Sequence, residues 1–100
     1  MDIHKKEAIL RLSHLTKKEI PNKELLINVY ANYIQDCEIL CTEYNYETDY
    51  DIVIKKLNDV DIKFGYDMIT LLGKELALEI FGIGDNWHEI VTEMRNFKPT

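Results

Sequence analysis

Residues 41 to 51 read CTEYNYETDYD and combine three tyrosines with four carboxylates, without a Lys or Arg. Tyrosine is favoured at protein interfaces because its rigid ring buries a large area while its hydroxyl stays polar. Clustered carboxylates steer a basic protein toward the surface that carries them. The segment therefore predicts a partner-binding surface made of Glu43, Tyr44, Tyr46, Glu47, Asp49, Tyr50 and Asp51.

Part of the same segment also has a structural explanation, as a junction between two helices. Thr48 followed by Asp51 resembles a capping box, and Glu47, Asp49 and Asp51 fall where negative charge offsets the dipole of a helix start. An interaction surface and a solvated helix junction both stay open from the sequence. The residues without a local structural reason are Glu43, Asn45 and Tyr46.

Charge along the chain indicates the class of partner. The formal net charge is −6, and residues 36–51 hold six acids and no base. Binding to DNA or RNA draws most of its affinity from Lys and Arg on phosphates, so this balance argues against a nucleic-acid reader. The basic residues of the first 24 positions are interspersed with acids, which favours a solvated face. We expect a basic protein partner and no direct nucleic-acid contact.

Two other clusters resemble ligand sites but depart from the known patterns. Gly82-Ile83-Gly84 resembles a phosphate-binding turn, yet Trp87 replaces the third glycine of a dinucleotide fingerprint and Asp85 would repel a phosphate. His88 has acidic neighbours at helical spacing, but Thr92 stands where the zincin pattern needs a second His. A structural turn and a solvated acidic face are the favoured interpretations, and we expect no metal site.

Cys37 and Cys41 lie four positions apart in a predicted helix. Cβ atoms at that spacing are about 5–6 Å apart, whereas a disulfide needs roughly 3.5–4.5 Å. A zinc site would need two further ligands, and no second CxxC or HxxxH supplies them. We expect two reduced thiols that pack in the core.

Motifs of nucleophilic or phosphate chemistry are missing. The sequence has no G-x-S-x-G elbow, no P-loop and no Cys-His motif, and Ser13 is its single serine. We therefore expect no enzyme, no catalytic residue and no cofactor.

The length and composition predict a single soluble domain spanning residues 1–100. One hundred residues suffice for one modest core, and 46% hydrophobic with 30% charged residues is ordinary for a globular protein. Charges interrupt the apolar positions of the first 15 residues, and no stretch approaches the roughly 20 apolar residues of a membrane span. We expect a cytoplasmic protein without membrane contact.

Apolar spacing of three and four predicts an all-α bundle of about five helices. The first helix runs from about Asp2 to Leu15, and Pro21 with Asn22 breaks the chain before a long second helix contacted on several sides. A third helix ends near Asp59-Val60-Asp61. A fourth runs from about Ile62 to Phe81, with Gly73 at a close helix crossing and Gly82 at its left-handed end.

A last helix, capped by Asp85, is predicted to carry Trp87 as a core anchor. Residues 76–84 could instead form a short strand, although the unbroken apolar spacing favours helix. The sequence leads to a small acidic protein-binding module of the inhibitor or immunity type, which masks a basic, nucleic-acid-handling partner. A structural adaptor or oligomerising helical subunit is the alternative. The oligomeric state stays open.

Overall fold

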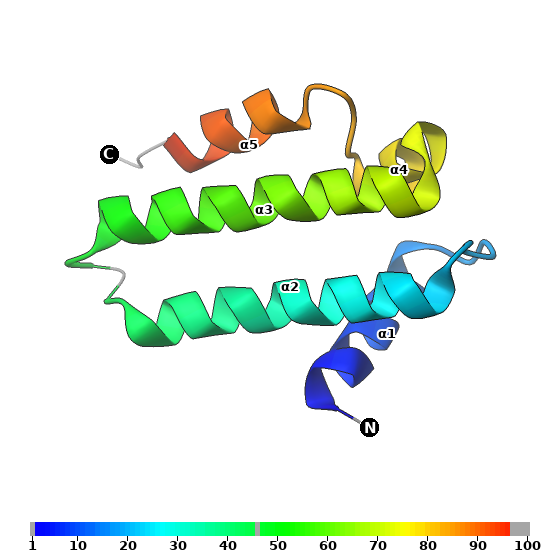
Figure 1. The fold of residues 1–100 in the computed structure, drawn as a ribbon, viewed down its shortest axis with the longest axis horizontal. Coiled ribbons are helices and arrows are strands. Elements are labelled where there is room, and N and C mark those ends of the chain that lie inside the picture. The colour runs from blue at the N-terminus through cyan, green and yellow to red at the C-terminus, as the bar shows by residue number, and fades with distance from the viewer. Residues whose placement is uncertain (1, 46, 97–100) are drawn as a thin grey trace.

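The computed structural model describes residues 2–45 and 47–96, the side chains of residues 95 and 96 excepted, and these residues form an all-α bundle of five helices. The two longest helices, α2 (Lys23–Glu43) and α3 (Tyr50–Leu72), run antiparallel side by side (Figure 1). Helix α1 (Ile3–Leu15) packs against α2, while α4 (Lys74–Phe81) and α5 (Trp87–Asn96) pack against α3. The segment that joins α2 to α3 therefore lies at one end of this pair.

The first two helices begin and end close to where the sequence predicts. The carboxylate of Asp2 caps α1 by accepting a hydrogen bond of 2.7 Å from the backbone N–H of His4. Asn22 precedes α2 in the left-handed region, and its side chain donates to the carbonyl of Leu71 instead of capping its own helix. The buried face of α1 is Ala8 and Leu12, whereas Ile3, Ile9 and Leu15 are exposed.

Helix α3 is continuous from Tyr50 to Leu72, so the predicted break at Asp59-Val60-Asp61 is wrong. Asp61 continues the inward spacing of Leu57, Phe64 and Met68, and it is buried with only 6% of its surface exposed. A polar side chain at an inward position does not end a helix when a partner satisfies it. The hydroxyl of Tyr33 on α2 supplies such a hydrogen bond.

The break between α3 and α4 falls at Gly73 instead of at residues 59–61. Gly73 has φ 86° and ψ 159°, a region that only glycine adopts at low cost, so it ends one helix and begins the next. The predicted close crossing at Gly73 is therefore wrong. Helix α4 confirms the helical interpretation of residues 76–81, and Gly82 ends it in the left-handed region as predicted.

The core lies where α1, α2, α4 and the second half of α3 meet. Leu26 and Met68 are fully buried there, together with Ile83 from the segment after α4. Aromatic rings join the helices: Phe64 stacks on Tyr33 with ring centroids 4.3 Å apart. Phe64 also meets Tyr30 and Phe81 edge-on, at 5.3 and 5.8 Å.

The overall shape is flat, with principal extents of 42 × 33 × 20 Å. Its radius of gyration is 14.3 Å, against about 13 Å for a typical 100-residue domain. A thickness of 20 Å corresponds to two layers of helices, since one helix with its side chains is about 10 Å across. Among the described residues no helix is both long enough and apolar enough to cross a bilayer.

Candidate functional site

The first candidate site is the predicted surface where α2 ends and α3 begins, which we call the acidic junction. Its described residues are Glu43, Tyr44, Glu47, Asp49, Tyr50 and Asp51. The structure brings them to one end of the helix pair because the chain reverses direction there (Figure 1). Tyr46, also predicted as part of the surface, lies outside the described residues.

Asn45 holds the connection in shape and so has a structural role that the sequence does not indicate. Its backbone N–H donates to the carboxylate of Asp49 at 3.1 Å, and its side-chain oxygen accepts from the N–H of Glu47 at 2.9 Å. Its backbone carbonyl accepts from the N–H of Asp49 at 2.7 Å. The reversal is therefore fixed by short-range hydrogen bonds, as in other Asx turns.

The predicted capping box is wrong. Asp49, not Thr48, is the N-cap of α3, and its side chain makes no cap hydrogen bond because it is turned back toward Asn45. Asp51 lies in the first turn of α3, where its charge offsets the helix dipole as predicted. Glu47 lies two residues before the cap, in the connecting turn, and is exposed. Its carboxylate thus joins Glu43 among the charges without a helix-capping role.

The two tyrosines of the junction are partly buried. Tyr44 ends α2, and the ammonium of Lys56 lies 5.7 Å from the centre of its ring, within cation–π range. Tyr50 is the first residue of α3. Both therefore pack within the junction while part of their surface stays exposed.

Glu43 and Glu47 are the most available charges of the junction. Both are exposed, and neither forms an ion pair with any side chain that the structure describes. Lys55 and Lys56 stand one turn into α3 and are exposed as well, so they reduce the negative potential on that side. The free negative charge is consequently concentrated on the end of α2 and the turn after it.

The second candidate site is a groove of about 310 Å³ lined by residues of all five helices, which the sequence does not reveal. Within its lining, the hydroxyl of Tyr33 donates a hydrogen bond to the carboxylate of Asp61. The indole N–H of Trp87 donates to the backbone carbonyl of the same residue at 2.9 Å. Asp61 thus links three helices. A single signal could have found it, namely that Asp61 falls on the apolar stripe of α3.

The groove is lined mainly by aromatic side chains and by few charged ones. Burial raises the pKa of the Tyr33 hydroxyl and its hydrogen bond to Asp61 raises it further, so Tyr33 stays protonated and remains a donor. Arg11 of α1 stands at the rim and pairs with Glu7 at 3.0 Å, which raises the pKa of the guanidinium. The rings that line the groove are Tyr30, Tyr33, Phe64, Phe81 and Trp87.

A tight helix contact positions Trp87 in this groove. A Cβ atom built on Gly65 of α3 would lie 2.0 Å from the Cδ1 and Nε1 atoms of the Trp87 indole. Only glycine leaves room for the ring, so the close crossing that was predicted at Gly73 occurs at Gly65. Trp87 packs against the core, in line with the predicted core anchor, but it is only half-buried.

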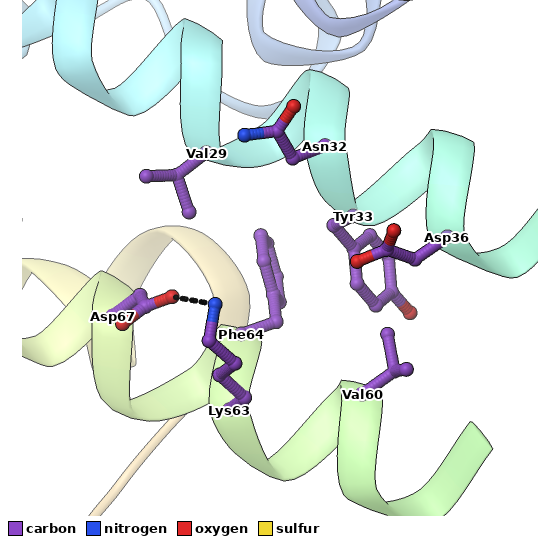
Figure 2. A pocket seen from close by; sticks show the side chains of 8 residues that line it. All are labelled: Val29, Asn32, Tyr33, Asp36, Val60, Lys63, Phe64 and Asp67. Atoms are coloured by element: carbon purple, nitrogen blue, oxygen red, sulfur yellow. Dashed lines mark ion pairs between the residues drawn. The ribbon is translucent and has the colours of Figure 1, made fainter. Parts of the chain in front are cut away.

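On the seam between α2 and α3 lies a third hollow of about 80 Å³, shown in Figure 2. Asn32 and Asp36 come to it from α2, and Lys63 and Asp67 from α3, with Lys63 and Asp67 3.6 Å apart. The volume admits a few water molecules, far below the 300–1,000 Å³ typical of small-molecule sites. It is a solvated seam between two helices.

The remaining sequence candidates have structural roles. Neither Cys37 nor Cys41 is in a disulfide; Cys37 is partly buried, but Cys41 is exposed, so its predicted core packing is wrong. In the turn after α4, the N–H groups of Gly82 and Ile83 donate to α4 carbonyls. Helix α5 begins at Trp87, after Asn86, so the predicted cap at Asp85 is wrong. Across the described part of the chain, no three His, Cys, Asp or Glu side chains gather to hold a metal ion.

Comparisons with known proteins identify no relative of this chain. No protein-family model matches the chain, and neither the curated proteins nor the solved structures contain a match.

Proposed function

We propose that this protein is a small helical module that binds and masks a basic, nucleic-acid-handling protein, with the acidic junction as its docking surface. The single observation that carries the proposal is the exposure of Glu43 and Glu47 at one end of the α2–α3 pair, without ion-pair partners among the described side chains. Charges that no internal partner neutralises keep their full potential for an incoming cationic surface.

The position of these charges supports the proposal further. Hydrogen bonds of Asn45 with Glu47 and Asp49 organise the described part of the junction. A preformed surface loses less conformational entropy on binding than a flexible one. Tyr44 and Tyr50 add partly exposed rings beside the carboxylates, which is the residue combination favoured at interfaces.

A specific observation favours the alternative, a structural adaptor or oligomerising subunit. Several large apolar side chains are exposed outside the junction, among them Leu10, Leu25 and Leu78. They come from three different helices, and single exposed apolar residues are normal on protein surfaces. Light scattering separates the two functions, because an oligomerising subunit forms larger species that high salt does not dissociate.

Capture followed by an activity assay tests the masking function. The protein and its Glu43→Lys/Glu47→Lys variant are used as bait in native extract at low and at high salt. We expect a basic partner that is retained by the wild type at low salt and lost from the variant. The nucleic-acid binding of this partner is then measured with one equivalent of the protein, and we expect it to fall. A partner whose nucleic-acid binding is unchanged would contradict the masking function.

A further inference from the structure

We propose that the acidic junction of one copy of this protein docks into a cleft on a second copy, where the carboxylates of Glu43 and Glu47 meet the ammonium groups of Lys17 and Lys23. We call this surface the lysine cleft; its lining comes from α1, from the segment that joins α1 to α2 and from the first residue of α2. The contact goes beyond the proposed function, because it gives the junction a second ligand. Where both ligands are present they compete for the same carboxylates, and this consequence alone rests on the proposed function.

The lysine cleft is concave and partly apolar. Its volume is about 500 Å³, which is enough for a few side chains of a protruding turn. Leu12 and Ile20 of its lining are buried, whereas Ile9 keeps 37% of its surface exposed. A turn that carries an aromatic ring beside its charges suits such a lining, and Tyr44 is a partly exposed ring next to Glu43.

The charge of the lysine cleft is opposite to that of the junction. Of the described residues that line it, three are lysines and one, Glu19, is an acid. Glu79 of α4 pairs with Lys18. Lys17 and Lys23 are exposed and form no ion pair with any side chain that the structure describes. On a chain of net charge −6, a locally positive hollow favours an acidic occupant.

The occupant is a second copy because the junction does not reach the cleft of its own chain. Lys23 is the first residue of α2 and Glu43 is the last, so the two surfaces lie about 30 Å apart at opposite ends of one helix. Figure 1 shows the junction at the end of α2 that is remote from the connection to α1. Complementary surfaces that are out of mutual reach on one molecule pair between molecules, as rings or chains.

The net charge of −6 opposes this contact, so ionic strength decides whether it forms. At about 0.1 M salt the Debye length is about 10 Å, and repulsion between distant acids is largely screened, whereas carboxylates that touch lysines are screened less. At about 1 M salt the length falls to about 3 Å, and the contact pairs weaken as well. The self-association should therefore be present at the lower salt concentration and dissociate at the higher one, unlike that of an apolar oligomer.

Sedimentation velocity of the full-length protein measures this self-association, at protein concentrations from about 10 μM to about 1 mM, which suit a contact smaller than a standard interface. Lys17→Gln/Lys23→Gln should weaken it about threefold to tenfold, the scale of two exposed charge pairs. Lys5→Gln/Lys6→Gln is the matched control, because it makes the same change in net charge at exposed positions of α1 outside the cleft. The control should leave the self-association constant within about a factor of two.

A mixture of two variants shows which surfaces meet. Glu43→Gln/Glu47→Gln should weaken self-association as Lys17→Gln/Lys23→Gln does, since each variant keeps only one of the two charged surfaces. In the mixture, the intact cleft of the first variant meets the intact junction of the second. We expect the mixture to form dimers and no larger species, because the two neutral surfaces that remain do not pair.

Three outcomes would overturn the inference. One is a wild type that stays monomeric at about 0.1 M salt up to about 1 mM protein, and another is an equal effect of the cleft variant and its control. A mixture that stays monomeric would show that the junction and the cleft do not meet. None of these measurements needs a basic partner. Self-association without any captured partner therefore refutes only the proposed function, and a captured partner beside a monomeric wild type refutes only the lysine cleft.

Discussion

The hydroxyl of Tyr33 on α2 donates a hydrogen bond to the buried carboxylate of Asp61 on α3, and this contact joins the two longest helices at the centre of the bundle. Trp87 adds a third helix through its hydrogen bond to the carbonyl of Asp61. A polar group at this position is tolerated because its partner is fixed by the stacking of Tyr33 on Phe64.

Removing either member of this pair should destabilise the fold. We expect Asp61→Ala to lower the free energy of unfolding by about 1–3 kcal/mol, since it leaves the Tyr33 hydroxyl without its acceptor. Tyr33→Phe should cost a similar amount, and the double variant less than the sum, with a coupling of about 0.5–3 kcal/mol. Urea unfolding of the four proteins measures this coupling. Additive costs would show that the two side chains do not interact in solution.

A methyl group on Gly65 should disturb the packing of α5 on α3. Because its Cβ would overlap the Trp87 indole, Gly65→Ala should cost about 1–3 kcal/mol and change the fluorescence of Trp87. Gly84→Ala is the matched control: its Cβ would meet ordinary contacts at 3.4 and 3.7 Å, so a change within about 0.5 kcal/mol is expected. Adding Trp87→Ala to the Gly65 variant should abolish most of the effect of the methyl group. Equal costs at both glycines would refute the close crossing.

His4 should make stability depend on pH. Its ring lies between two carboxylates, with Nε2 2.5 Å from Glu38 and Nδ1 3.3 Å from Asp2. The Glu38 hydrogen bond is the main cause that raises the pKa of His4 above its ordinary value of 6.5. A raised pKa in the folded state means that the stabilisation is complete below about pH 6.5 and is lost as the pH rises through the folded pKa.

We therefore expect the stability difference between the wild type and His4→Gln to be largest in mild acid and to shrink as the solution becomes alkaline. Chemical unfolding across that range measures it, and NMR titration of the imidazole gives the pKa directly. Glu38→Gln, which removes the main partner, should bring the titration closer to the ordinary value. A difference that grows with rising pH would have the wrong sign for this contact.

Much of the fold follows from the spacing of apolar residues. The extent of α1, the long helix α2 and the left-handed end of α4 at Gly82 are local features, and the sequence predicts them correctly. The boundary between α3 and α4 is not local in this sense. In the sequence Asp61 indicates a helix break, because only the structure shows that Tyr33 donates a hydrogen bond to it. The conformation of Gly73 in turn depends on where α4 packs.

The candidate sites also differ in how far the sequence predicts them. Glu43 and Glu47 are predictable because a run of acids without a base is visible in the sequence. The groove is not, because its lining comes from helices that are distant in the chain and meet only through tertiary packing. The sequence around Gly65 does not indicate its role, because only the packing of the Trp87 ring against it explains a glycine within α3.

The central claim is that the acidic junction steers and holds a basic partner, and association kinetics test it most directly. With the captured partner, the association rate is measured for the wild type, Glu43→Lys/Glu47→Lys and the control Glu24→Lys/Glu75→Lys, which carries the same charge change on exposed acids of α2 and α4. The melting temperatures should be nearly equal, as for exposed positions in general. The junction variant should associate more slowly than the control at low salt, and the gap should close as salt shortens the Debye length to about 8 Å and below. Equal rates for the two variants at low salt would contradict the claim and leave residues 43–51 as a helix junction only.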